Sequence, residues 1–223
     1  MLHVRVATAL IALLFLSSAL AAPFAVQVGE ARIGLDAPPG FADTGFTGSP
    51  RLQELAESIT SPSNRILLFA ISDGDLRKFT LGDPPELRRY TILVTPRELE
   101  RERVDDARFA QLVAAGLAEI SLRAPPGAVL ADYIERQPPG KMALLGELRR
   151  DADAVSVLLG ARGAPAARLQ KPPYVVSSST YMRIRGKALH LGVFSVYEGP
   201  ADLDWLRAMT VRWVDDLRRL NPR

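Results

Sequence analysis

The sequence predicts an α+β fold: an antiparallel sheet flanked by helices, an αβα sandwich in a single domain. Three observations predict it. Short apolar runs bounded by turn residues recur along the chain, as buried strands do. Three stretches repeat apolar residues every three or four positions, as amphipathic helices do. Near the C-terminus, two strand-like runs surround one glycine, which indicates a hairpin and therefore antiparallel pairing.

The first 21 residues have the layout of a cleavable secretory signal peptide. Arg5 supplies the positive charge, residues 6–16 form an apolar run, and small residues follow. Ala19-Leu20-Ala21 fits the small-x-small rule, so we expect cleavage after Ala21, or as a second choice after Ala22. An uncleaved anchor is the alternative, although the apolar run is short for a bilayer core of about 30 Å. The domain is then 22–223, and it meets a membrane only through the signal peptide before cleavage.

In the first half of the chain, proline, glycine and polar turn residues separate the expected elements. Residues 31–35 predict a first strand. Ser49 and Pro50 are typical of a helix cap and first turn, and an apolar stripe continues that helix to Ile59. Further along we expect a buried strand over 65–72, a turn at 73–75 and a strand over 89–95.

In the second half, an amphipathic pattern predicts a helix over 105–122. Residues 123–152 are poorly determined, and 141–150 fit either a strand or a short helix. The C-terminal helix has an apolar stripe that includes Leu206 and Trp213 and should pack on the core. The remaining expected elements are a strand over 155–159, hairpin strands over 174–185 and 187–197, and a helix over 201–220.

Gly186 predicts a two-residue hairpin turn, either Arg185-Gly186 or Gly186-Lys187, and both registers give every side chain on the two strands the same face. One face is apolar and should meet the core: Met182, Ile184, Leu189, Leu191 and Val193. The other face is more polar and carries Tyr181, Arg183, Arg185, Ala188, His190, Gly192 and Phe194. A function of the hairpin should therefore be sought on the second face.

Four residues of this polar face are the candidate binding residues: Tyr181, Arg183, Arg185 and His190. The planar fork of arginine matches carboxylate and phosphate groups, and tyrosine adds an amphipathic platform. We therefore expect an anionic or carboxylate-bearing partner. The alternative is that these side chains only keep the outer face of an edge hairpin soluble, as charged residues on edge strands often do.

Composition excludes several kinds of site. The chain has no cysteine, so disulfides, zinc–thiolate sites and cysteine nucleophiles are excluded. The formal net charge of +3 gives no reason to expect nucleic-acid binding. We interpret the arginine pairs 88–89, 149–150 and 218–219 as solvated surface.

Motif patterns predict neither a metal site nor a cofactor. Beyond the signal peptide His190 is the one histidine, and phosphate-loop and dinucleotide fingerprints are missing. The Asp73-Gly74-Asp75 run departs from a calcium loop, because Arg77 stands where an oxygen ligand belongs. A serine hydrolase would need His190 beside a serine, but the chain has no nucleophile elbow, and Ser195 falls on the opposite face of the hairpin.

The run from Tyr181 to Trp205 carries a family resemblance. It consists of a strand, a Gly-Lys turn, a strand ending Phe-Ser-Val-Tyr, and Asp204-Trp205 opening a helix. It resembles the C-terminal part of small exported bacterial proteins of unknown function, and its layout is similar to PsbP-like domains. The early Pro39-Gly40-Phe41 fits the same pattern. The resemblance covers about a quarter of the chain; it implies an α+β sandwich and no catalytic residues.

Together these observations predict an exported protein of the cell envelope, periplasmic or secreted. The expected role is a non-enzymatic binding or accessory module whose partner is an envelope protein or an anionic ligand. The alternative is a periplasmic hydrolase with a site built from carboxylates that only the fold brings together. A deep cleft with convergent ionisable groups of perturbed pKa would favour the hydrolase.

Overall fold

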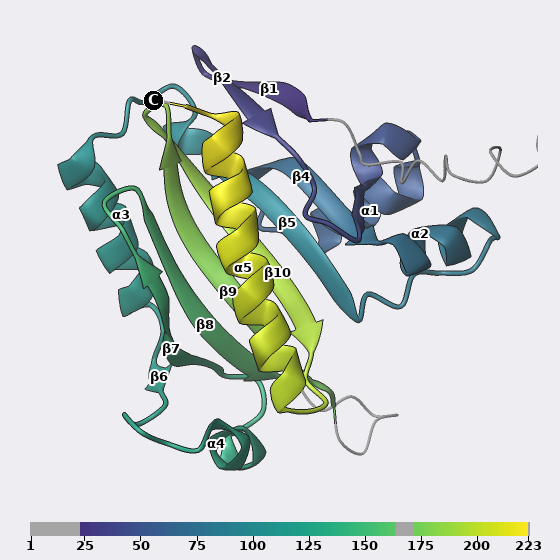
Figure 1. The fold of residues 1–223 in the computed structure, drawn as a ribbon, viewed down its shortest axis with the longest axis vertical. Helices are drawn as coiled ribbons and strands as arrows, with labels where there is room; N and C mark the ends of the chain where they lie inside the picture. Colours follow the sequence, from purple (N-terminus) through teal and green to yellow (C-terminus); the bar gives the residue numbers. More distant parts are fainter. Residues whose placement is uncertain (1–22, 164–171, 223) are drawn as a thin grey trace, which may run out of the picture.

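A computed structural model describes residues 23–163 and 172–222; the expected cleavage site at Ala21 and Ala22 lies outside them. Within these ranges, eight strands form one sheet in the order β3-β4-β5-β10-β9-β8-β7-β6 (Figure 1). Neighbouring strands are antiparallel, except for the short parallel pair β6–β7. A separate hairpin, β1–β2, makes a second, two-stranded sheet. The strands are β1 Phe24–Val28, β2 Ala31–Leu35, β3 Phe41–Asp43, β4 Asn64–Ser72, β5 Arg89–Pro96, β6 Leu122–Arg123, β7 Met142–Arg150, β8 Ala154–Arg162, β9 Tyr174–Ile184 and β10 Lys187–Val196.

The helices cover both faces of the large sheet (Figure 1). The expected α+β class, with helices flanking a mainly antiparallel sheet, is confirmed. In the described residues no helix is both long and apolar enough to cross a membrane. The helices are α1 Pro50–Ser58, α2 Asp73–Thr80, α3 Asp106–Ala118, α4 Leu130–Arg136 and α5 Pro200–Leu220, with short 3₁₀ turns η1 Thr44–Thr47 and η2 Arg97–Leu99.

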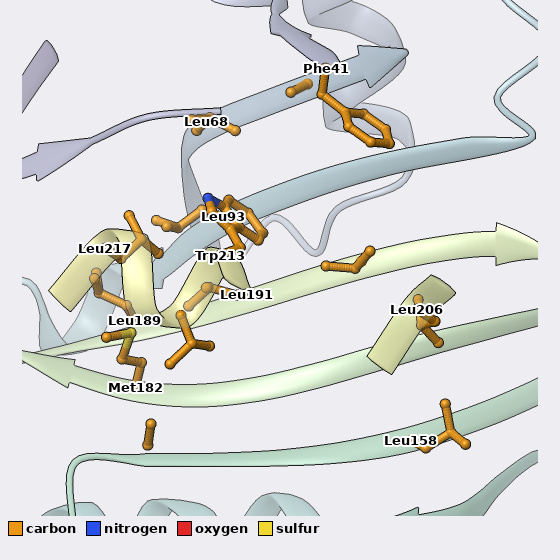
Figure 2. Close-up of a cluster of buried hydrophobic side chains, with 14 of the residues drawn as sticks. Phe41, Leu68, Leu93, Leu158, Met182, Leu189, Leu191, Leu206, Trp213 and Leu217 are labelled. Atoms are coloured by element: carbon orange, nitrogen blue, oxygen red, sulfur yellow. The ribbon is translucent and has the colours of Figure 1, made fainter. Parts of the chain in front are cut away.

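Helix α5 crosses one face of the sheet and fills the main core. Its apolar stripe places Leu206, Trp213 and Leu217 over the inward side chains of the sheet, among them Leu93 and Leu191 (Figure 2). The β1–β2 hairpin and α4 extend the same core. Trp213 is 1% exposed, and its indole N–H donates to the carbonyl of Asp36 at 2.9 Å. The expected stripe of the C-terminal helix is therefore the centre of the core.

Asn221, just after α5, ties the end of the chain to β2. Its side-chain amide donates to the carbonyl of Gly34, and its side-chain oxygen accepts from the Gly34 N–H, both at 2.8 Å. A side chain at Gly34 would not fit well, because its Cβ would lie 3.2 Å from the carbonyl oxygen of Leu220. The missing side chain of Gly34 thus lets α5 end close against β2.

The opposite face carries two smaller clusters. Around α1, Leu52 and Ala56 pack against Ile71 and Ile92 of the sheet. Around α3, Phe109 and Val113 pack against neighbours that include Val155 and Ala188. The expected amphipathic helix over 105–122 therefore exists, capped by Asp105, whose carboxylate accepts from the Arg108 N–H at 2.8 Å. It ends four residues earlier than the apolar pattern suggested.

The turn expected at 73–75 is wrong, because these residues begin α2. Ser72 caps that helix: its hydroxyl accepts from the Asp75 N–H at 3.0 Å. Asp75 is buried and accepts from the Glu86 N–H at 2.9 Å, so it fastens the loop after the helix. In the undetermined segment 123–152, residues 142–150 form strand β7 and 130–136 form α4.

Candidate functional site

The β9–β10 hairpin turns through Arg185 and Gly186, as the two-residue turn required. Ile184 pairs with Lys187, and both turn residues have positive φ, 50° at Arg185 and 73° at Gly186. The carbonyl of Gly186 accepts from the Val104 N–H at 2.8 Å, so the segment before α3 lies against the turn. A Cβ on Gly186 would stand 3.2 Å from Cγ of Arg103, which passes directly over it.

A cleft of about 1270 Å³, which we call the tip cleft, opens around this turn. Four chain segments form it: the residues leading into α3, the turn between β7 and β8, the tip of the hairpin, and the end of α5. All four meet at the end of the sheet where strand β9 stops (Figure 1). Its charged lining residues are Arg103, Asp105, Asp106, Arg149, Asp151, Asp153, Arg183, Arg185 and Arg218.

Ion pairs occupy the inner part of the tip cleft. Arg218 donates to Asp151 at 2.9 Å and also to Asp153. Arg149 donates to Asp151 and, at 2.6 Å, to Asp215 of α5. The hydrogen bond from Arg149 is the main cause that holds the pKa of Asp151 below its ordinary value. Asp151 is therefore negatively charged, and arginines already neutralise it.

The two arginines expected to bind a ligand both line the tip cleft, but they point to different neighbours. Arg183 pairs with Asp106 in the first turn of α3. Arg185 is exposed and donates to the backbone carbonyl of Arg32 in β2 at 2.9 Å. Among the described residues Arg185 has no carboxylate partner, and Arg103 has neither an ion pair nor a hydrogen bond.

The other two expected binding residues, Tyr181 and His190, do not line the tip cleft. They lie on the sheet face that α3 covers, with ring centroids 5.0 Å apart. The Tyr181 hydroxyl packs so closely on α3 that a Cβ at Gly116 would lie 2.0 Å from it. Oγ of Ser179 lies 2.7 Å from Nε2 of His190, and burial lowers the pKa of His190 to about 4. The imidazole is therefore neutral at pH 7.

The interpretation of this face as the exposed side of an edge hairpin is wrong. β9 and β10 lie in the middle of the sheet, between β8 and β5. The sequence did contain the signal: an amphipathic helix over 105–122 needs a sheet face to cover, and it covers this one. The solvated-surface interpretation is also wrong for Arg149 and Arg218, which are held in ion pairs inside the tip cleft.

Two alternative chemistries can be compared with this geometry. Ser179 lies on the same face as His190 and makes the serine–histidine contact that Ser195 does not make. Ser179 is buried, with 9% of its surface exposed, and neither Ser179 nor His190 lines the tip cleft. A carboxylate-based hydrolase needs convergent acids of raised pKa. Burial raises the pKa of Asp36 and of Asp43, but both lie outside the tip cleft. Among the described residues, no group of three or more potential metal ligands gathers.

No protein-family model and no curated protein sequence matches the chain significantly. Among solved structures, the chain is similar to the Saccharomyces cerevisiae Ran-binding protein Mog1p, with 11% sequence identity and a TM-score of 0.40. The match covers 89% of this chain and 94% of that one. So distant a likeness says nothing about function. The resemblance to PsbP-like domains stays a prediction.

Proposed function

We propose that this chain is an exported, non-enzymatic binding module of the cell envelope, periplasmic or secreted, and that its tip cleft binds an anionic group of a partner. One observation carries the proposal. At the rim of the cleft, Arg103 and Arg185 present guanidinium groups that no carboxylate of the described residues neutralises. The inner carboxylates of the cleft are already paired.

The arrangement favours an anion over a cation for a simple electrostatic reason. Arg149 and Arg218 already neutralise Asp151, so a bound cation would have to break an existing pair. A bound carboxylate or phosphate breaks no ion pair, because its partners are the two rim arginines; at most Arg185 gives up its bond to the Arg32 carbonyl. The planar fork of arginine offers such groups two parallel hydrogen bonds. The ion pairs below also hold the cleft walls in place before binding, which reduces the entropy lost on binding.

The titration behaviour of the cleft supports binding rather than proton transfer. A general acid or base works best with a pKa near the working pH. The arginine partners of Asp151 lower its pKa below the ordinary value, and therefore further from neutral pH. His190, whose pKa also lies well below 7, is outside the cleft.

Two simple anions test the binding site: inorganic phosphate and an acetylated dipeptide with a free C-terminal carboxylate. We expect at least one to cause saturable NMR shifts at the backbone amides of Val104 and Gly186, next to the rim arginines. The double charge reversal Arg103→Glu and Arg185→Glu should remove those shifts. Arg77→Glu, an exposed arginine on α2 outside the cleft, is the matched control. Saturable binding that survives the double reversal, or no saturable binding of either anion, overturns the proposal.

Export has its own test. The mature protein recovered from the periplasmic fraction should begin at Ala22 or Pro23 when its N-terminus is sequenced. An intact Met1 found in the membrane fraction contradicts cleavage and leaves the anchor alternative standing.

A further inference from the structure

Strand β4 has an outer edge that is only partly paired. On its inner side it pairs with β5 from Asn64 to Ile71. On its outer side β3 pairs only with Ala70, Ile71 and Ser72. In the part of the chain that the structure describes, no strand lies beside the outer edge from Asn64 to Phe69. We call this stretch the open edge.

Side chains form hydrogen bonds with the backbone of the open edge only at its Phe69 end. The carbonyl of Phe69 accepts from the hydroxyl of Thr44 at 3.0 Å, and the Phe69 N–H donates to the Asp43 carboxylate. Among the described residues, no group outside β5 bonds to the backbone of Ile66, Leu67 or Leu68. Proteins usually block such an edge with proline, an inward charge or a covering loop. The apolar run from Ile66 to Ile71 has neither proline nor charge.

A groove of about 810 Å³ runs along the open edge. Residues of η1 and α1 form one wall, and Phe24 of β1 belongs to the other; Figure 1 shows β4 between the β1–β2 hairpin and α1. Phe46 of η1 is 67% exposed and meets Phe24 edge to face, with ring centroids 5.2 Å apart. The two rings make an apolar anchor point near the Phe69 end of the open edge.

The opposite end of the groove carries an arginine without a carboxylate partner. Arg97 lies there, because its backbone N–H donates to the carbonyl of Ser63 and its side chain to the carbonyl of Pro62. No carboxylate of the described residues pairs with Arg97. Arg65 beside it is already paired with Glu100 at 2.8 Å. The lining also includes the carboxylates of Asp43 and Glu57, so Arg97 is the unpaired cation of the groove rather than its only free charge.

We propose that the groove along the open edge binds an extended segment of a partner protein, which adds a strand to the sheet beside β4. The segment continues the line of β3 and runs antiparallel to β4. It carries an apolar side chain toward Phe46 and an acidic side chain toward Arg97. Main-chain hydrogen bonds provide affinity in this mode of recognition, and pockets for alternate side chains provide specificity.

This site is separate from the tip cleft, since the two share no lining residue, and it does not rest on the function proposed above. The probe is a phage-displayed library of random nonapeptides, selected on the purified protein. We expect enrichment of peptides with alternating apolar residues, an apolar or aromatic residue in the N-terminal half and an acidic one in the C-terminal half. Absence of enrichment overturns the proposal.

The enriched peptide is then synthesised with and without N-methyl groups on alternate residues. In one of the two methylation registers binding should be lost, because those N–H groups form the new ladder. Phe46→Ser and Arg97→Ala should each weaken the unmodified peptide about tenfold. Leu81→Ser is the matched control, since Leu81 is 84% exposed and lies outside the groove.

Hydrogen exchange separates strand addition from other ways of binding. On addition of the peptide, amide exchange in the stretch Ile66–Leu68 should slow at least tenfold, while exchange around Gly186 stays unchanged. Binding without protection in β4 overturns the proposal. So does a dimer of the free protein that Phe46→Ser dissociates, because the occupant is then a second copy.

Discussion

The two faces of the large sheet are built differently. On the α5 face one continuous apolar cluster runs from β2, past Trp213, to α4. On the other face the apolar side chains divide into two clusters, one under α1 and one under α3. β10 shows the division along its length: Ala188 belongs to one cluster, Phe194 packs against the other, and His190 and Gly192 lie between them. The α5 face therefore provides most of the stability, whereas the second face includes a polar break.

The largest effect tests the α5 face. Trp213→Ala should cost about 3–5 kcal/mol of unfolding free energy, because it empties the centre of the main core. Urea denaturation at constant m-value measures it. Trp205→Ala is the matched control, since the same residue type on the same helix is only partly buried. If the two variants lose similar amounts, α5 does not carry the main core.

The next effect tests the polar break. Because folding lowers the pKa of His190 from 6.5 to about 4, the unfolded chain binds its proton first as the pH falls. His190 therefore costs stability progressively between pH 6.5 and 4, on the order of 3 kcal/mol in total, with no further loss below pH 4. Denaturation at several pH values should show this loss. In His190→Gln the slope over that window should be shallower; an unchanged slope means that His190 is not its source.

A smaller effect tests the contact between α3 and the sheet face beside the polar break, where Gly116 meets the ring of Tyr181. An alanine at Gly116 would push its Cβ into the ring of Tyr181, so Gly116→Ala should lose about 1–2 kcal/mol despite the better helix propensity of alanine. Combining it with Tyr181→Leu, which removes the obstructing ring, should recover part of that loss. Strictly additive free energies in this double-mutant cycle would show that the two residues do not touch.

The smallest effect tests the ion pair between Arg183 of β9 and Asp106 in the first turn of α3. Arg183 pairs with Asp106, whose side chain is 85% exposed. Pairs of this kind contribute about 0.2–1 kcal/mol and weaken with salt. A double-mutant cycle with Arg183→Ala and Asp106→Ala should give a coupling in this range at low salt that shrinks at 1 M salt. A larger, salt-independent coupling would place the pair in the interior of the molecule.

Local patterns predicted most of this fold and little of the site. The turn at Gly186, the two hairpin faces and the α5 stripe followed from periodicity, which depends only on near neighbours. The position of β9 and β10 in the middle of the sheet did not, because it depends on which distant strands pair with them. The tip cleft was missed for the same reason. Arg103, Asp151 and Arg218 come from three separate segments, and only the folded sheet brings these segments together at one end of its central strands.

The bond between Asn221 and Gly34 has a consequence for how the protein is made. It joins residues 187 positions apart in sequence, and the helix that ends beside it supplies the central side chain of the core. A chain under synthesis therefore holds its β2, β4 and β5 segments for most of its translation time without the element that buries them. Until α5 and Asn221 have been synthesised, the main core cannot close over these strands.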